Sequence, residues 1–176
     1  MTITIEERAA IEVRAEGRKL TGYAALYNTE ARIADFSETI SPGAFDTSLA
    51  ESRDILALVD HDRTKVLGRT KAGTLRLSSD TRGLKFEIDL PNTTVANDVL
   101  ANVRNMGGCS FGFSVDKEDW QGERRTLQSV TLHEVSVVSA WPAYDGTSVS
   151  ARAKQNRTAT QRRIALLEME AGNVAV

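Results

Sequence analysis

The segment 107–113, Gly-Gly-Cys-Ser-Phe-Gly-Phe, places a thiol and a hydroxyl side by side after two glycines. Glycine lets the backbone bend and leaves room beside it, so a substrate carbonyl could approach the Ser110 hydroxyl. A serine hydroxyl becomes an effective nucleophile only when a general base takes its proton. The chain has two histidines, His61 and His133, and these are the candidates for that base.

Residues 108–112 match the G-x-S-x-G pattern of the nucleophile elbow. That motif requires a strand before the serine, a helix after it and a histidine base later in the chain. Here a helix pattern precedes Ser110 and a strand pattern follows it, while the histidine downstream lies 23 residues further on, on a neighbouring strand pattern. The sequence therefore argues against an α/β-hydrolase.

A catalytic triad is defined by geometry and not by chain order, so His61 could serve as the general base for Ser110. The second nitrogen of the His61 ring then needs an acceptor, and Glu134 could provide one. The aspartates on either side of His61 are too close in sequence to reach its ring easily. In a regular strand His133 and Glu134 point to opposite faces, so both could hardly enter one site.

Cys109 is the alternative nucleophile, because thiols are intrinsically more reactive than hydroxyls. Strand alternation, however, puts Cys109 on the same face as Phe111 and Phe113, which predicts a buried thiol. Two histidines and one cysteine show no metal-ligand spacing, so no metal and no cofactor are expected.

Length and composition favour one domain with a tail. The 176 residues are 41% hydrophobic and 26% charged, which is ordinary for a globular protein, and we expect a body over residues 1–150 and a tail over 151–176. A single cysteine and the lack of an early apolar run favour a reducing cytosol and no membrane span. The net charge of −2 argues against nucleic-acid binding.

Most of the body is strand-like. Alternating residues at 74–77 and 84–90, with turn chemistry between them, predict a hairpin. The apolar run 55–59 predicts a buried strand that ends next to His61. Strands are also expected over 20–27, 111–115 and 126–138, and helices over 41–50 and from Thr93 or Thr94 to near Gly107. Many short strands and few helices favour a closed barrel or a sandwich.

The tail is more basic than the body. It carries five Lys and Arg side chains against two Glu. Residues 151–158 are polar and lack periodicity, which predicts a linker, and residues 162–171 predict a short amphipathic helix. The helix could pack on its own body or on a partner, and its basic side chains would most simply form a solvated face.

Several blocks of this sequence, in order, resemble the prohead proteases of tailed bacteriophages, the capsid-maturation serine proteases distantly similar to the herpesvirus assemblins. The resemblance runs from about Gly22 to Arg152. It rests on the blocks 40–45 (ISPGAF), 59–62 (VDHD), 67–69 (LGR), 109–113 (CSFGF), 134–138 (EVSVV) and 142–144 (PAY), followed by Thr147.

The resemblance implies a closed β-barrel with surrounding helices, a mainly β fold with a few helices. It maps the nucleophile onto Ser110, the base onto His61 and the third member onto Glu134, whereas the assemblins use a second histidine, for which His133 would be the candidate. Arg69 and the loop after Val138 are candidates for oxyanion stabilisation.

Such a family acts inside the immature capsid in the host cytoplasm. Its substrates are scaffold protein or the scaffold-like segment of the major capsid protein, and the protease also cleaves itself and self-associates. The polar residues 151–158 are a plausible site of self-cleavage, because proteases act on chain that can be threaded. The alternative is a catalytically silent capsid or scaffold component with the same fold.

Overall fold

The structure, a computed structural model, describes residues 5–10, 12–33 and 35–139. The expected boundary at residue 150, the linker 151–158 and the helix 162–171 lie outside the described residues, as do the blocks 142–144 and Thr147. No helix in the described part of the chain is long and apolar enough to cross a membrane.

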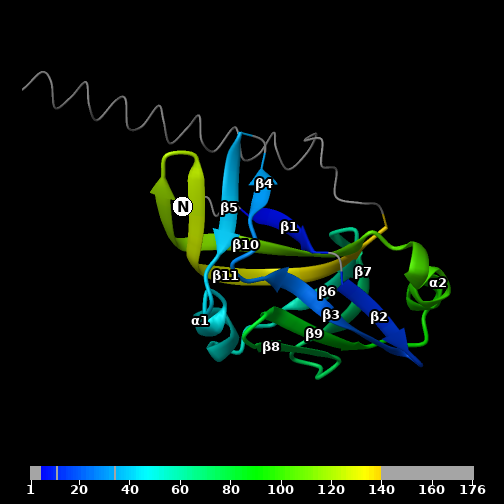
Figure 1. The fold of residues 1–176 in the computed structure, drawn as a ribbon. Coiled ribbons are helices and arrows are strands. Elements are labelled where there is room, and N and C mark those ends of the chain that lie inside the picture. The colour runs from blue at the N-terminus through cyan, green and yellow to red at the C-terminus, as the bar shows by residue number, and fades with distance from the viewer. Residues whose placement is uncertain (1–4, 11, 34, 140–176) are drawn as a thin grey trace, which may run out of the picture.

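Two β-sheets make up most of the described chain (Figure 1). The large sheet has seven strands: β1 (Glu6–Ala10), β4 (Ala31–Ile33), β5 (Phe36–Ile40), β6 (Leu56–Val59), β7 (Asp62–Arg69), β10 (Gly108–Gln121) and β11 (Arg124–Val138). The small sheet has four: β2 (Glu12–Glu16), β3 (Lys19–Leu26), β8 (Leu75–Ser79) and β9 (Gly83–Asp89). The prediction of a mainly β chain with few helices is confirmed.

The prediction of a closed barrel is wrong, because within the described residues neither sheet closes on itself. A barrel needs a hydrogen-bond ladder that returns to its first strand. Here β1 ends one edge of the large sheet and β2 begins one edge of the small sheet, on either side of residue 11. At the opposite side β7 contacts β8 and β9 without pairing with them. The two sheets therefore meet through side chains.

Apolar side chains from both sheets fill the space between them. β10 contributes Phe111 and Phe113, whose rings stack at 5.0 Å between centroids, and Phe45 packs edge-on against Phe111 at 5.5 Å. β3 and β9 contribute Leu20, Leu84, Phe86 and Ile88, all almost fully buried. Burial of each such side chain stabilises the fold by about 1.5–3 kcal/mol.

Strand β11 organises the large sheet. It pairs antiparallel with β10 along its whole length, and in parallel with β5 near its start and with β6 near its end. Between these two parallel partners lies α1 (Asp46–Ala50), where the Ser48 hydroxyl accepts a hydrogen bond from the Leu132 N–H at 2.9 Å. The segment that joins β5 to β6 thus covers the middle of this edge of β11.

Several predicted elements are confirmed. The 74–90 hairpin is β8 and β9, and the helix near residue 94 is α2 (Thr94–Asn102), with the Thr93 side chain accepting from the Ala96 N–H as its N-cap. A 3-10 turn, Val103–Asn105, continues α2. The helix predicted over 41–50 begins late, because residues 42–45 form a turn and α1 starts at Asp46.

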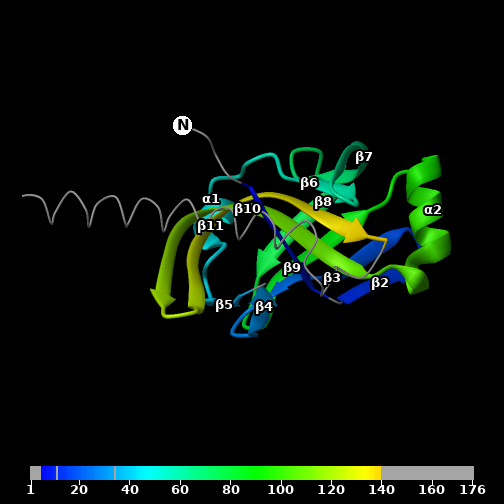
Figure 2. The same ribbon diagram turned by 90° about the horizontal axis from the view of Figure 1, so that it is seen from above.

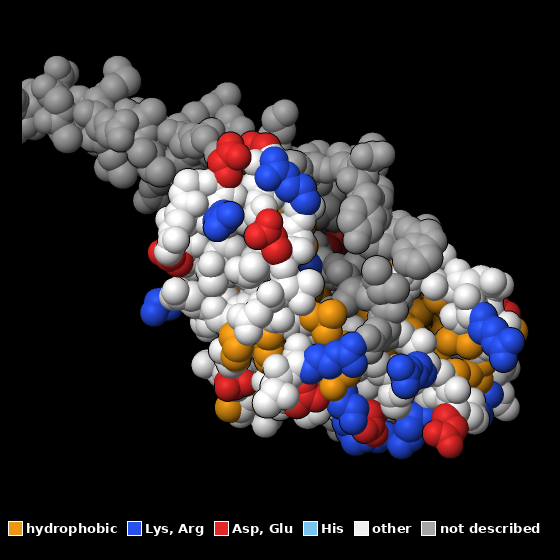
Figure 3. Space-filling model, viewed as in Figure 1, with side chains coloured by type: hydrophobic (Ala, Val, Ile, Leu, Met, Phe, Trp, Pro, Cys, Tyr) orange, Lys and Arg blue, Asp and Glu red, His pale blue; other side chains and the backbone are white. Residues whose placement is uncertain are grey.

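The molecule is elongated along the large sheet. In the view from above, α2 lies at one end and the turn between β10 and β11 projects at the other (Figure 2). Lys and Arg side chains are interspersed with Asp and Glu on the face drawn in Figure 3. On the small sheet, for example, Arg76 pairs with Asp89, and Lys19 lies 3.6 Å from Glu87.

Candidate active site

His61 and Glu134 come together because β6 is the parallel neighbour of the end of β11. Val59 pairs with Val137 and Leu56 with Glu134, and in the turn after β6 the His61 N–H donates to the Ser136 hydroxyl. The His61 Nδ1 atom lies 2.7 Å from Glu134 Oε1. Two residues 73 positions apart in the sequence are thus hydrogen-bonded through strand pairing.

His61 occupies a tight turn between β6 and β7. Val59 pairs with Asp62, so Asp60 and His61 form a two-residue loop, and both have positive φ, 50° and 60°. A type I′ hairpin turn requires this conformation at both central residues and usually contains glycine, since side chains strain it. The Asp60 carboxylate holds the turn by accepting from the Ser139 N–H and hydroxyl, at 2.7 and 2.6 Å.

The surroundings of His61 favour its charged form. Burial alone lowers the pKa of the ring, but the hydrogen bond with Glu134 and the negative charges of Glu134, Glu7 and Asp60 outweigh it and raise the pKa above its ordinary value of 6.5. The Glu7 carboxylate lies 3.9 Å from Nε2, on the side of the ring opposite Glu134. The imidazole therefore sits between two carboxylates.

A β-bulge at His133 corrects the predicted face assignment of β11. Gly112 pairs with Glu134, and the next residue, Phe113, pairs with Leu132, so His133 is the extra residue. Leu132 consequently faces the core, although in a regular strand two residues that are two positions apart, such as Leu132 and Glu134, would share a face. The His133 Nε2 atom lies 3.0 Å from Ser114 Oγ. Of the two candidates for the third position, Glu134 contacts the His61 ring and His133 contacts Ser114.

Ser110 lies close to this histidine–glutamate pair, because the cross-strand pair of Ser110 and Ser136 is two residues along the ladder from the pair of Gly112 and Glu134. It is directly opposite Ser136 on β11, and residues paired across strands point to the same face of the sheet. Rows two residues apart along a strand are separated by about 7 Å. Ser110 is 3% exposed, and among the described residues no hydrogen bond joins it to the His61 ring. The structure thus brings the three predicted residues to one face and joins two of them directly.

Gly112 is required by the position of the Glu134 carboxylate. A Cβ atom on Gly112 would lie 2.5 Å from Glu134 Oε1, which is closer than any real contact. The absence of a side chain therefore lets the carboxylate lie over β10 and reach His61. This explains the glycine of the C-S-F-G-F block through packing, without any unusual backbone angle.

Cys109 faces away from these residues. It is 1% exposed, belongs to the core with Phe111 and Phe113, and its burial raises the pKa of its thiol. The prediction of a buried thiol is confirmed. A neutral, buried sulfur is a poor nucleophile.

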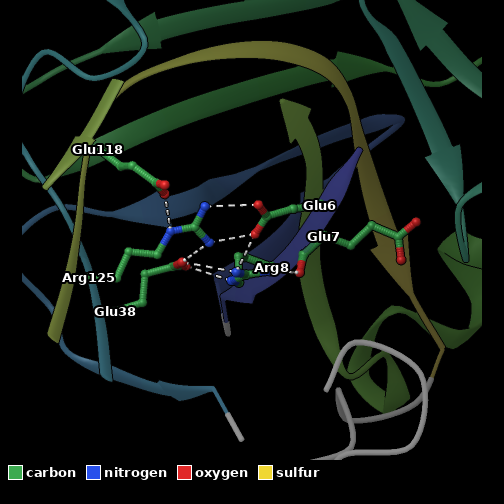
Figure 4. A network of polar contacts seen from close by, with 6 residues as sticks. All are labelled: Glu6, Glu7, Arg8, Glu38, Glu118 and Arg125. Atoms are coloured by element: carbon green, nitrogen blue, oxygen red, sulfur yellow. Dashed lines mark hydrogen bonds and ion pairs between the residues drawn. The ribbon is translucent and has the colours of Figure 1, made fainter. Parts of the chain in front are cut away.

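The strand β1 brings Glu7 to the site and is anchored by a buried ion network (Figure 4). Glu38, 3% exposed, accepts from Arg8 at 2.6 Å and from Arg125 at 2.9 Å, and Arg125 also binds Glu6 and Glu118. The Glu7 side chain extends away from this network. Strand alternation thus makes one face of β1 an anchor and turns the other towards His61.

Arg69 lies far from His61 along the sheet. It pairs with Leu56 at the start of β6, whereas His61 follows the end of that strand, and its guanidinium binds Asp54. A cavity of about 380 Å³ opens near this end, lined by Leu49, Ser52, Arg53, Ile55, Thr70, Lys71 and Leu77. Within the described ranges, no group of three or more His, Cys, Asp or Glu side chains could hold a metal ion.

A comparison of the sequence with protein families gives one result that identifies the chain's relatives. A profile of the caudovirus prohead serine proteases matches residues 4–162, which is most of the sequence. The chain belongs to this family. No curated protein matches the sequence significantly.

The fold is similar to that of a capsid assembly protease whose structure has been solved. The capsid assembly protease of bacteriophage T4, gp21, superposes with a TM-score of 0.56 over 77% of this chain and 96% of that one, at 10% sequence identity. At this identity the likeness concerns the fold. It shows that the two-sheet arrangement described above also occurs in a capsid assembly protease.

Sequence reasoning identified Ser110, His61 and Glu134 but missed three neighbours. Ser136 could have been found, because it lies two residues after Glu134 and therefore on the same strand face. Gly112 offered no signal beyond its residue type. Glu7 offered none, since its place depends on the pairing of β1 with β10.

Proposed function

We propose that this prohead serine protease family member is an active endopeptidase with Ser110 as its nucleophile, His61 as its general base and Glu134 as the carboxylate that orients the base. The observation that carries the proposal is the 2.7 Å contact between His61 Nδ1 and Glu134 Oε1, on the sheet face where Ser110 lies in the adjoining row. A carboxylate at Nδ1 leaves Nε2 free to act as the base, as in other serine proteases.

In this mechanism His61 Nε2 takes the Ser110 proton while Ser110 Oγ attacks the scissile carbonyl carbon. The tetrahedral intermediate collapses as the imidazolium returns the proton to the leaving amine, the C–N bond breaks, and an acyl-enzyme ester remains. Water, deprotonated by the same histidine, then hydrolyses the ester and restores the serine hydroxyl. Glu134 stabilises the imidazolium that forms in each half of the cycle.

The attack requires a local change of rotamer or backbone that brings Ser110 Oγ within hydrogen-bond reach of Nε2. Catalytic hydrogen bonds commonly tighten only when substrate binds. The neighbouring rows are about 7 Å apart, and the His61 ring spans part of that distance.

The substrates that fit this family are scaffold protein and the scaffold-like segment of the major capsid protein, inside the assembling prohead. The test is co-expression of the full chain with its cognate capsid protein, followed by mass spectrometry of the capsid subunits. Wild type should shorten them, and Ser110→Ala should reduce the rate by about 10⁶-fold, the loss seen when a serine protease loses its nucleophile. If the Ser110→Ala protein still cleaves the capsid protein and the Cys109→Ser protein does not, the chain is a cysteine peptidase.

A second candidate is a catalytically silent capsid or scaffold component with the same fold. The observation that favours it is the position of Glu7. Its carboxylate lies 3.9 Å from His61 Nε2, the atom to which the Ser110 hydroxyl would have to donate its proton. Full-length capsid subunits at full expression of the wild-type chain would support this candidate. The same experiment therefore decides between the two.

A further inference from the structure

We infer that Ser136 is a positioning residue that locks the His61–Glu134 pair, an inference that rests on the proposed function. Ser136 is 1% exposed and lies directly opposite Ser110 in the β10–β11 ladder. Its hydroxyl donates to Glu134 Oε2 at 2.5 Å and accepts from the His61 backbone N–H at 3.3 Å. One hydroxyl therefore binds both partners of the pair.

These contacts close a ring of three hydrogen bonds. The His61 ring binds Glu134 Oε1, Glu134 Oε2 binds the Ser136 hydroxyl, and that hydroxyl binds the backbone of His61. The carboxylate cannot rotate without breaking two of these bonds. This cycle of hydrogen bonds thus determines that Nδ1 of His61 is directed to Glu134, and it leaves Nε2 for the reaction.

The same bonds identify which of the two opposed serines is unsuited to attack. The single hydroxyl proton of Ser136 is committed to Glu134, and its oxygen faces the His61 backbone and not Nε2. Ser110 has no such commitment to Glu134 or to the His61 backbone. Ser136 therefore acts through its neighbours, and Ser110 remains the hydroxyl for catalysis.

Ser136 also stabilises the turn that carries His61. A side chain in the left-handed region strains the backbone, and Asp60 and His61 are both in that region. Strained residues persist where surrounding contacts over-determine them. The Ser136 hydroxyl on the His61 N–H and the Ser139 contacts to Asp60 supply those contacts from the same strand end.

The first test measures cleavage of the co-expressed capsid protein by Ser136→Ala and Ser136→Cys. Loss of a hydrogen bond to a charged group predicts a rate about 10- to 100-fold lower in both variants. Cys has nearly the size of Ser but is a weak hydrogen-bond donor. Ser136→Cys therefore separates the loss of the hydrogen bond from a folding defect that Ser136→Ala could cause. Ser129→Ala, a serine of the same strand outside the site, is the matched control and should cleave at the wild-type rate.

The second test does not depend on proteolysis. In Ser110→Ala protein with ¹⁵N-labelled histidine, NMR should show a downfield Nδ1 proton for His61, assigned against a His133→Gln variant. Adding Ser136→Ala should broaden or remove that signal, whereas adding Ser129→Ala should leave it intact.

The inference is overturned if the Nδ1 signal persists unchanged without the Ser136 hydroxyl, or if the signal is lost while cleavage stays within twofold of wild type. If Ser110→Ala still cleaves the capsid protein, the proposed function fails. The NMR result would then still decide whether Ser136 holds the His61–Glu134 pair.

Discussion

At the scale of single residues, the site is governed by how many negative charges surround one imidazole. Glu134 orients the ring through Nδ1, and Glu7 adds a second charge near Nε2. Both favour the imidazolium, which is the form that cannot accept the Ser110 proton. In the proposed mechanism, the raised pKa of His61 therefore sets the lower end of the pH range for cleavage.

The acid limb of the pH–rate profile should accordingly lie above pH 6.5, the ordinary pKa of histidine. Glu7→Gln removes one of the charges that raise the His61 pKa, so the limb should move to lower pH, with Glu16→Gln on exposed β2 as the control. Cleavage rates measured against pH, together with NMR titration of His61 in Ser110→Ala protein, check this. An unchanged limb and titration in Glu7→Gln would contradict it.

The sign of the accompanying stability effect follows from the same shift. A raised histidine pKa in the fold stabilises the folded state fully below the unfolded pKa, and this contribution is lost as the pH rises through the folded value. The pairing of His61 with the two carboxylates thus stabilises the fold on the acid side of the His61 titration.

At the scale of elements, the edge strand β1 is held by charge as well as by backbone hydrogen bonds. Arg8 and Arg125 converge on Glu38, and Glu6 bridges the two arginines from β1 itself. Burial alone would raise the pKa of Glu6, but the two guanidinium groups lower it. Glu38 is the most buried carboxylate of this network and is shared by both arginines. Its loss would leave the two buried arginines balanced only by Glu6 and Glu118.

Glu38→Gln should therefore destabilise the protein by about 3–5 kcal/mol, the cost of removing one member of a buried ion pair. Chemical unfolding followed by circular dichroism measures this change. Glu51→Gln, which removes a half-exposed carboxylate paired with Arg53, should change stability little. A Glu38→Gln protein as stable as wild type would show that the network does not contribute in this way.

The elements that sequence patterns missed share this polar character. β1 carries the buried or paired charges of Glu6 and Arg8, β2 carries the exposed charges of Arg14 and Glu16, and β7 is largely exposed over Asp62–Val66. The hairpin at 74–90 and the helix at Thr94–Asn102 were predictable because their apolar periodicity and turn or cap residues are local. A buried salt bridge between distant strands leaves no such local pattern.

At the scale of the whole molecule, two open sheets pack face to face and present the site on the outer side of the large sheet. The core side chains Phe111 and Val135 face inward, whereas Ser110 and Glu134 face outward on the same strands. Ser110 and Glu134 are nonetheless only 3% and 8% exposed, so on this face they are buried as well. Ser139, the last residue that the structure describes, contacts Asp60 at the same end of the sheet as the site.

Self-cleavage after the folded body is the expected whole-molecule consequence of an active site. We expect purified wild-type protein to be cut within residues 151–158, because this polar segment can be threaded into a protease. Intact-mass spectrometry should find the shortened chain in wild type and the full-length chain in Ser110→Ala. Identical masses for the two proteins would argue against self-cleavage in this segment.

The sequence by itself determined the candidate nucleophile, the candidate base and the family, because residue types in ordered blocks are local information. Tertiary structure alone decided that Glu134 and not His133 meets His61, because the parallel pairing of β6 with the end of β11 brings His61 to Glu134, whereas His133 contacts Ser114. It alone decided the neighbours Gly112 and Glu7, since strand pairing joins positions that are far apart in the chain. It also decided that the sheets stay open, because the closure of a barrel depends on a hydrogen-bond ladder that alternation within each strand does not specify.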